Sequence, residues 1–132
     1  MDNSDSRIPD VIERLIQALH TPSELVQVAV ADCLPPLVQA TPDDVEIIVD
    51  GLYSTLTTGA KYASRRGAAY GLAGVVKGRG LSTLKEFDLM DRLHEAVEDK
   101  AVFQSRQGAL FAFETLSATL GRTFGNLSNL LS

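Results

Sequence analysis

Six basic side chains lie between residues 61 and 85, a stretch that contains no acid: Lys61, Arg65, Arg66, Lys77, Arg79 and Lys85. Clustered ammonium and guanidinium groups attract phosphate even on a protein whose net charge is negative. Lys61 and Arg66 lie at the start of the helix predicted at about residues 60–77. Lys77 and Arg79 lie at its end, about 20–25 Å away for a rise of about 1.5 Å per residue. That separation suits an extended phosphate backbone better than a small anion. The alternative is that these charges only form a solvated helix face.

Arg65 and Arg106 have a second interpretation, because they occupy the same position of a repeated pattern. An Arg at the start of the second helix of a repeat pairs with an acid in the preceding turn and forms a ladder between repeats. Asp99 is the acid that would serve Arg106. A structural role is therefore the alternative for both arginines.

No group of residues has the spacing of a catalytic or metal site. His94 lacks the second His at i+4 that a zinc-protease helix requires. The single cysteine, Cys33, falls at a small position of the repeat, so we expect it in the core. A DNA glycosylase on a helical scaffold would need a carboxylate and aromatics in the basic groove, and residues 61–85 contain no acid and no Trp. We predict no enzyme activity, no cofactor and no metal.

Composition limits the class of protein. The chain has 132 residues, enough for one domain, and its 45% hydrophobic content excludes disorder over the full length. The net charge of −5 divides into −8 for residues 1–60, +6 for 61–85 and −3 for 86–132. The longest uncharged apolar stretch, 67–76, is too short to cross a bilayer, and the acidic N-terminus is no signal peptide. We expect a cytoplasmic protein without membrane contact.

Apolar residues recur at helical spacing along the chain, and no stretch alternates as a strand would. Thr21-Pro22-Ser23-Glu24 predicts a helix start with Thr21 as the cap and Pro22 at the first helical position. Pro35 and Pro36 are expected to kink or end the helix that follows. The pattern predicts six helices, at about residues 8–20, 22–39, 43–57, 60–77, 83–98 and 101–120.

The second helices of three predicted hairpins share one pattern. Gln27, Arg65 and Arg106 align at offsets of 38 and 41 residues, and small and apolar positions follow in the same order. A period near 40 with two helices per unit is typical of HEAT-type repeats. We predict an all-α, right-handed α-solenoid of about three HEAT-type hairpins. The expected division is a flexible 1–7, repeats at about 8–40, 41–80 and 81–121, and a divergent or truncated tail at 122–132.

Three segments also resemble one family in detail. The sequence from Lys61 to Gly78, the following run from Glu98 to Glu114, and residues 15–38 are similar to the general-control translational activator, a very large HEAT-repeat protein. That family activates the kinase of translation initiation factor two during amino-acid starvation. The resemblance covers roughly residues 8–124 and falls in the central region that is similar to elongation factor three. The chain would be a fragment or a short paralogue of such a protein.

The resemblance implies a non-catalytic scaffold. Its central region is associated with ribosome binding and with an ABC-type ATPase partner, whereas the kinase is contacted through another region. The exposed ends of the repeat stack could also support self-association. The alternative is a generic protein–protein interaction solenoid with no ribosome or RNA role. The residues we expect to bind ribosome, RNA or a partner are Lys61, Arg66, Lys77, Arg79, Arg65 and Arg106.

Overall fold

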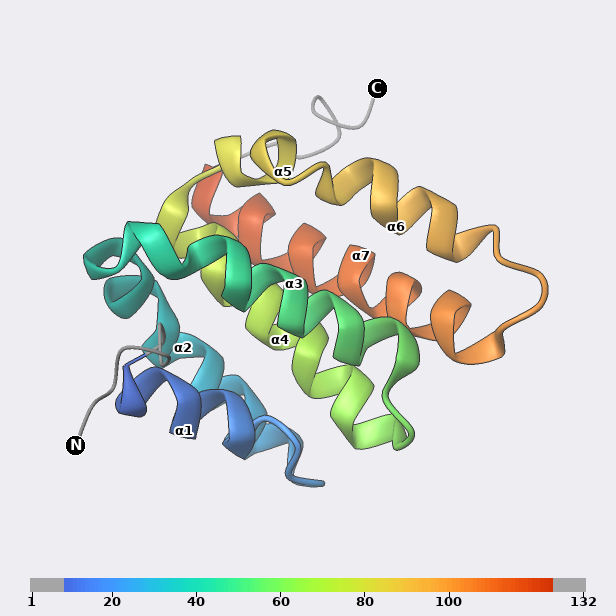
Figure 1. The fold of residues 1–132 in the computed structure, drawn as a ribbon, viewed down its shortest axis with the longest axis horizontal. Coiled ribbons are helices and arrows are strands. Elements are labelled where there is room, and N and C mark those ends of the chain that lie inside the picture. The colour runs from blue at the N-terminus through green and yellow to red at the C-terminus, as the bar shows by residue number, and fades with distance from the viewer. Residues whose placement is uncertain (1–8, 125–132) are drawn as a thin grey trace.

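Helices make up every regular element between residues 9 and 124, the range that the computed structural model describes (Figure 1). They pack as antiparallel hairpins, and the predicted all-helical solenoid is confirmed. Each predicted repeat interval contains one hairpin, although the boundaries themselves stay a prediction. In order, the elements are α1 (Asp10–Ala18), α2 (Glu24–Ala40), the 3-10 helix η1 (Pro42–Asp44), α3 (Val45–Thr58), α4 (Tyr62–Arg79), α5 (Ser82–Glu86), α6 (Leu89–Val97) and α7 (Phe103–Phe124).

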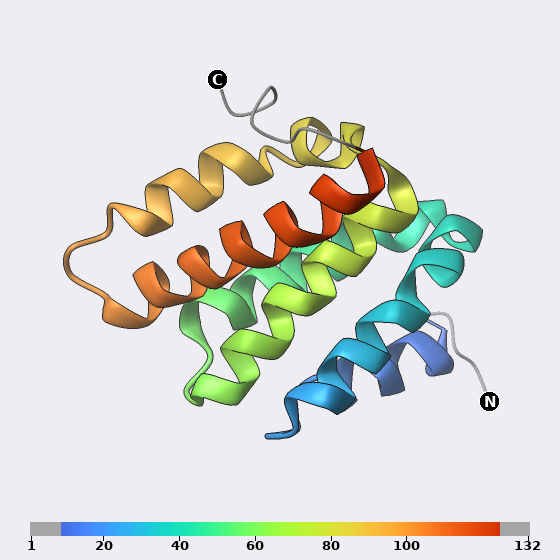
Figure 2. The ribbon, with the colours of Figure 1, turned by 180° about the vertical axis from the view of Figure 1, so that it is seen from behind.

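The ends of several helices differ from the sequence prediction. The cap of α2 is Ser23, whose side chain accepts a hydrogen bond from the Val26 amide, so the helix begins later than Thr21 predicts. Helix α2 continues through Pro35 and Pro36 to Ala40, and its ribbon changes direction in this half (Figure 2). The predicted helix over 83–98 is divided into α5 and α6, because Asp88 adopts a left-handed conformation with φ of 53°.

The predicted chain ends fall only in part within the described residues. Helix α7 extends to Phe124, so residues 122–124 of the predicted tail are helical. The predicted flexible segment 1–7 and the rest of the tail, 125–132, lie outside the described range.

Helix α4 is the centre of the fold and contacts α2, α3 and α7 (Figure 2). Its interior face is made of small residues and a few larger aliphatic ones, so neighbouring helices approach closely. Burial of the apolar side chains around it supplies the main stabilising term. The fully buried positions include Leu34, Val38, Ile48, Leu56, Leu72, Val75, Leu93, Ala109 and Ala112.

Cys33 does not lie in the core, so that prediction is wrong: the thiol is exposed. The equivalent residue of the second hairpin, Gly71, faces the side chains of Leu19 and Leu52. Leu19 belongs to the preceding hairpin. Cys33 is in the first hairpin, which has no preceding neighbour among the described residues, so nothing covers the same position.

Two glycines allow successive hairpins to touch through their backbones. A Cβ atom added to Gly67 would lie 1.8 Å from the carbonyl oxygen of Leu19, and one added to Gly108 would lie 1.8 Å from that of Leu56. Both oxygens belong to the end of the first helix of the preceding hairpin. Any larger residue would therefore push two hairpins apart.

The aligned polar residues cap the turn inside each hairpin. The side-chain amide of Gln27 donates to the carbonyl oxygens of Leu19 and Thr21, at 2.7 and 2.9 Å. The Arg65 guanidinium donates to the Gly59 carbonyl at 2.9 Å, and that of Arg106 to the Asp99 carbonyl at 2.8 Å. The predicted structural role is therefore present, but the acceptor is a backbone carbonyl.

The Asp99 carboxylate serves a different purpose from the one predicted for it. It accepts hydrogen bonds from the amides of Ala101 and Val102, at 2.9 and 3.1 Å. These amides lie in the turn before α7. A carboxylate that satisfies such backbone donors stabilises the turn without forming an ion pair.

The same residues connect neighbouring hairpins. Arg66 Nε donates to Gln27 Oε1 at 2.7 Å, and Arg65 Nη2 donates to Gln107 Oε1 at 2.6 Å. Arg66 and Gln107 are equivalent in the repeat pattern, as are Gln27 and Arg65. The result is a side-chain ladder between hairpins. The residue at the Gln27 or Arg65 position of one hairpin bonds to the residue that comes directly after the equivalent position in the next hairpin.

The glycine contact predicts a large, position-specific effect. We expect Gly108→Ala to lower the free energy of unfolding by about 3 kcal/mol, because overpacking against backbone outweighs a gain in helix propensity of about 1 kcal/mol. Gly51, in α3, has nothing within 4 Å of an added Cβ. Gly51→Ala should therefore stabilise the fold in urea unfolding followed by circular dichroism. Equal effects of the two substitutions would contradict the contact.

The ladder predicts that Gln107 matters for stability. Arg65 is only 5% exposed, so Gln107→Leu leaves a buried charged donor without its acceptor and should cost about 1–3 kcal/mol. Gln107→Glu keeps an acceptor and should retain the stability of the parent chain. Gln104, exposed one turn earlier, is the control, and Gln104→Leu should change the unfolding free energy by less than about 0.5 kcal/mol. Urea unfolding of all three variants distinguishes the ladder from a general loss of polarity.

Candidate functional site

The predicted cations divide into two groups once the fold is known. Arg65 is buried, and its guanidinium is engaged by Gly59 and Gln107. Arg66 is half-buried and donates both to Gln27 and, at 2.9 Å, to the Pro22 carbonyl. Together with Arg106, which donates to Asp99, they hold the hairpins in place.

The other predicted cations lie at the two ends of α4. Lys61 directly precedes the helix and is exposed, whereas Lys77 and Arg79 belong to its last turn. Sixteen residues separate Lys61 from Lys77, which corresponds to about 24 Å along the helix. Cations in a last turn also interact favourably with the helix dipole, so part of their role is local. The distance along the helix between the two ends is therefore the one predicted from the sequence. Fewer cations than predicted are available at these ends, because Arg66 is engaged by hydrogen bonds within the protein.

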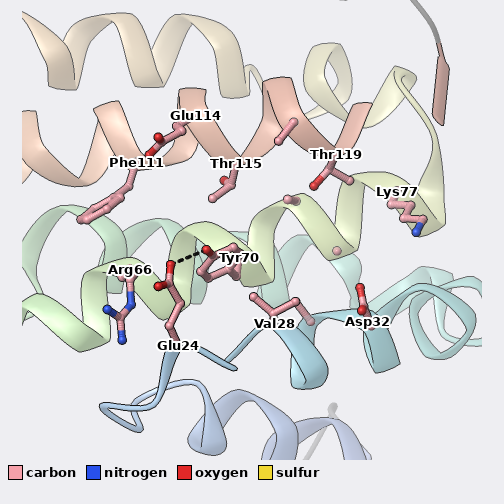
Figure 3. Close-up of a pocket in the computed structure, with 14 residues that line it drawn as sticks. Glu24, Val28, Asp32, Arg66, Tyr70, Lys77, Phe111, Glu114, Thr115 and Thr119 are labelled. Carbon is pink, nitrogen blue, oxygen red and sulfur yellow. Dashed lines mark hydrogen bonds between the residues drawn. The ribbon is translucent and has the colours of Figure 1, made fainter. Parts of the chain in front are cut away.

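A groove of about 310 Å³ lies between α2, α4 and α7, which are the second helices of the three hairpins (Figure 3). Small residues form its floor, and Val28, Tyr70 and Phe111 contribute apolar surface. Arg66 and Lys77 line it, so the structure brings these two predicted residues to one surface. Lys61, Arg65, Arg79 and Arg106 are not part of this lining.

Three carboxylates of the groove were missed by the sequence analysis: Glu24, Asp32 and Glu114. A signal for part of this surface was present in the repeat alignment. Asp32, Tyr70 and Phe111 are related by the same offsets of 38 and 41 residues, so they occupy one repeat position and face one side of the stack. Charge counts along the chain could not show it, because the acids lie outside the basic stretch.

Tyr70 is the polar centre of this groove. Its hydroxyl donates a hydrogen bond of 2.6 Å to Glu24 Oε2, as the dashed line in Figure 3 shows. Burial, this hydrogen bond and the negative charges of Glu24 and Glu114 together raise the pKa of Tyr70 to about 12, against the opposing charge of Arg66. The phenol therefore stays neutral at physiological pH and orients the Glu24 carboxylate.

Other chemistry has little support within residues 9–124. In that range no three His, Cys, Asp or Glu side chains are grouped to hold a metal ion. None of the helices described is both long and apolar enough to cross a membrane.

Comparison with known proteins gives a consistent result. The chain is 48% identical over 124 residues to the mouse protein "Stalled ribosome sensor GCN1", covering 94% of this chain and 5% of that protein. It is 41% identical over 128 residues to the "eIF-2-alpha kinase activator GCN1" of Saccharomyces cerevisiae, with the same coverage. It is 45% identical over 120 residues to "Protein ILITYHIA" of Arabidopsis thaliana, covering 91% of this chain and 4% of that protein.

No protein-family model matches the chain, and no solved structure matches it. The chain spans about one-twentieth of the length of the curated relatives it matches. The similarity nevertheless extends over almost all of its own residues, including the ladder and the groove. This chain therefore belongs to the GCN1 family, as a homologue of a short segment of those long proteins.

Proposed function

We propose that the chain is a non-catalytic HEAT-repeat scaffold segment of a cytoplasmic translational activator, and that it binds ribosomes and protein partners to promote kinase activation during amino-acid starvation. One observation carries this proposal, the 48% identity over 94% of the chain to a protein named a stalled ribosome sensor. The names of the relatives describe sensors and activators, which supports a role in binding.

The cations at the two ends of α4 form the surface that we assign to phosphate, with Lys61 and Lys77 exposed and Arg79 half-buried. Lys61 and Lys77 project from the two ends of the helix, and Arg79 lies next to Lys77. Arg65, Arg66 and Arg106 act as positioning residues, because their guanidinium groups are occupied by hydrogen bonds within the protein. The rigid spacing of the two ends would let the surface follow an RNA backbone.

The remaining partners expected from the resemblance stay predictions. An ABC-type ATPase would bind the same scaffold, and the stress-response kinase would be reached only through other regions of a longer chain. A surface for protein partners is supported by the carboxylates of the groove, which are unsuited to phosphate. The competing function is therefore a protein-binding solenoid with no RNA role.

The phosphate surface predicts a salt-sensitive association with ribosomes. We expect Lys61→Glu combined with Lys77→Glu to weaken co-sedimentation of the chain with purified ribosomes roughly tenfold at low salt, because contacts to phosphate release counterions. Binding of the parent chain should also fall as salt is raised. Circular dichroism should show unchanged helicity, since both side chains are exposed.

The matched control carries Lys85→Glu and Lys100→Glu, two exposed lysines outside this surface. It changes the net charge by the same amount and should leave co-sedimentation within about twofold of the parent chain. Equal losses in both double variants would contradict the assigned surface. Association with ribosomal proteins that does not respond to salt would instead favour the protein-binding alternative.

A further inference from the structure

The groove between α2, α4 and α7 is built to admit a side chain from outside the protein. Its floor contains Ala31, Ala73 and Gly74, and a Cβ added to Gly74 would lie 2.6 Å from the Ala31 carbonyl oxygen. Helices α2 and α4 therefore touch at the bottom while their larger side chains stand apart above it. A volume of about 310 Å³ is at the lower end of the range for ligand sites.

The walls of this groove combine apolar surface with negative charge. Val28 is 37% exposed, and Tyr70 and Phe111 are half-buried; in Figure 3 Phe111 lies on the Arg66 side of Tyr70 and Val28 on the other side. Glu24 and Glu114 come from helices on opposite sides, and both act on Tyr70. Among the side chains that the structure describes, the ion pair closer than 4.0 Å joins Arg92 to Asp50, so the groove acids form no direct salt bridge with the described cations.

The two cations of the lining offset this negative charge only in part, because three carboxylates line the groove. Arg66 directs Nε and Nη2 to Gln27 and Pro22, which bind the hairpins together. Lys77 belongs to the last turn of α4, at the Asp32 end of the groove (Figure 3). The opposite half, around Tyr70, contains Glu24 and Glu114 together with Arg66 (Figure 3).

We propose that this groove binds a basic segment of a protein partner, with an arginine side chain between Glu24 and Glu114 and an adjacent apolar side chain against Val28. A guanidinium group suits the site because it pairs with carboxylates and stacks on aromatic rings such as Tyr70. This interaction differs from the phosphate surface in requiring carboxylates, although Lys77 at the Asp32 end of the groove belongs to both surfaces. An RNA backbone is the occupant that these carboxylates disfavour.

The test uses a short fluorescein-labelled peptide of Gly-Leu-Arg repeats and measures fluorescence anisotropy with the complete 132-residue chain. We expect Glu24→Gln combined with Glu114→Gln to weaken binding at least about fivefold, because charged pairs are lost while the substituted amide oxygen at position 24 still accepts from Tyr70. The matched control, Glu46→Gln with Glu98→Gln, removes the same charge from exposed sites elsewhere and should bind like the parent.

A second variant tests the shape of the groove without changing its charge. Ala118 lines the groove and is exposed, so Ala118→Phe should fill it and weaken the peptide to a similar degree. A Gly-Leu-Glu peptide should not bind. Equal weakening by the two pairs of Glu→Gln substitutions would overturn the proposal.

Discussion

The contact between Gly67 and the Leu19 carbonyl, repeated between Gly108 and Leu56, is the constraint on which the stack depends. Both contacts place the second helix of one hairpin against the end of the first helix of the hairpin before it. The turn at that end is capped by Gln27 or by Arg65. Backbone contact without an intervening side chain leaves little freedom in how successive hairpins are oriented, and it explains why α4 can pack closely against α2, α3 and α7.

This way of joining hairpins also determines which charges remain for function. The ladder occupies the guanidinium groups of Arg65 and Arg66 with hydrogen bonds inside the protein. These groups therefore do not serve the phosphate binding that their sequence context favours. The cations that remain exposed, Lys61 and Lys77, lie at the two ends of α4. Between them, the second helices form a groove whose accessible charge is mainly negative. Two surfaces of opposite character on one small stack are what the proposed scaffold, with separate RNA and protein partners, would require.

Much of the fold was predictable, because helical periodicity and a repeat near 40 residues are properties of the chain itself. The position shared by Gln27, Arg65 and Arg106 also predicted a ladder, although carbonyl acceptors replaced the expected carboxylates. The exposed thiol of Cys33 was not predictable from its small-residue position. Burial there depends on a hairpin packed against that face, as Leu19 is against Gly71, and the described residues contain no such hairpin before Cys33.

The sequence by itself determined the helical class, the repeat and the presence of a basic stretch, because each depends on residues close together in the chain. Tertiary structure decided which of those cations are free, since that depends on whether a partner such as Gln107 lies opposite. Tertiary structure also forms the groove, in which Glu24 and Glu114, from helices distant in sequence, both lie near Tyr70. Electrostatic character arises from distances in space, and the order of residues alone does not contain those distances.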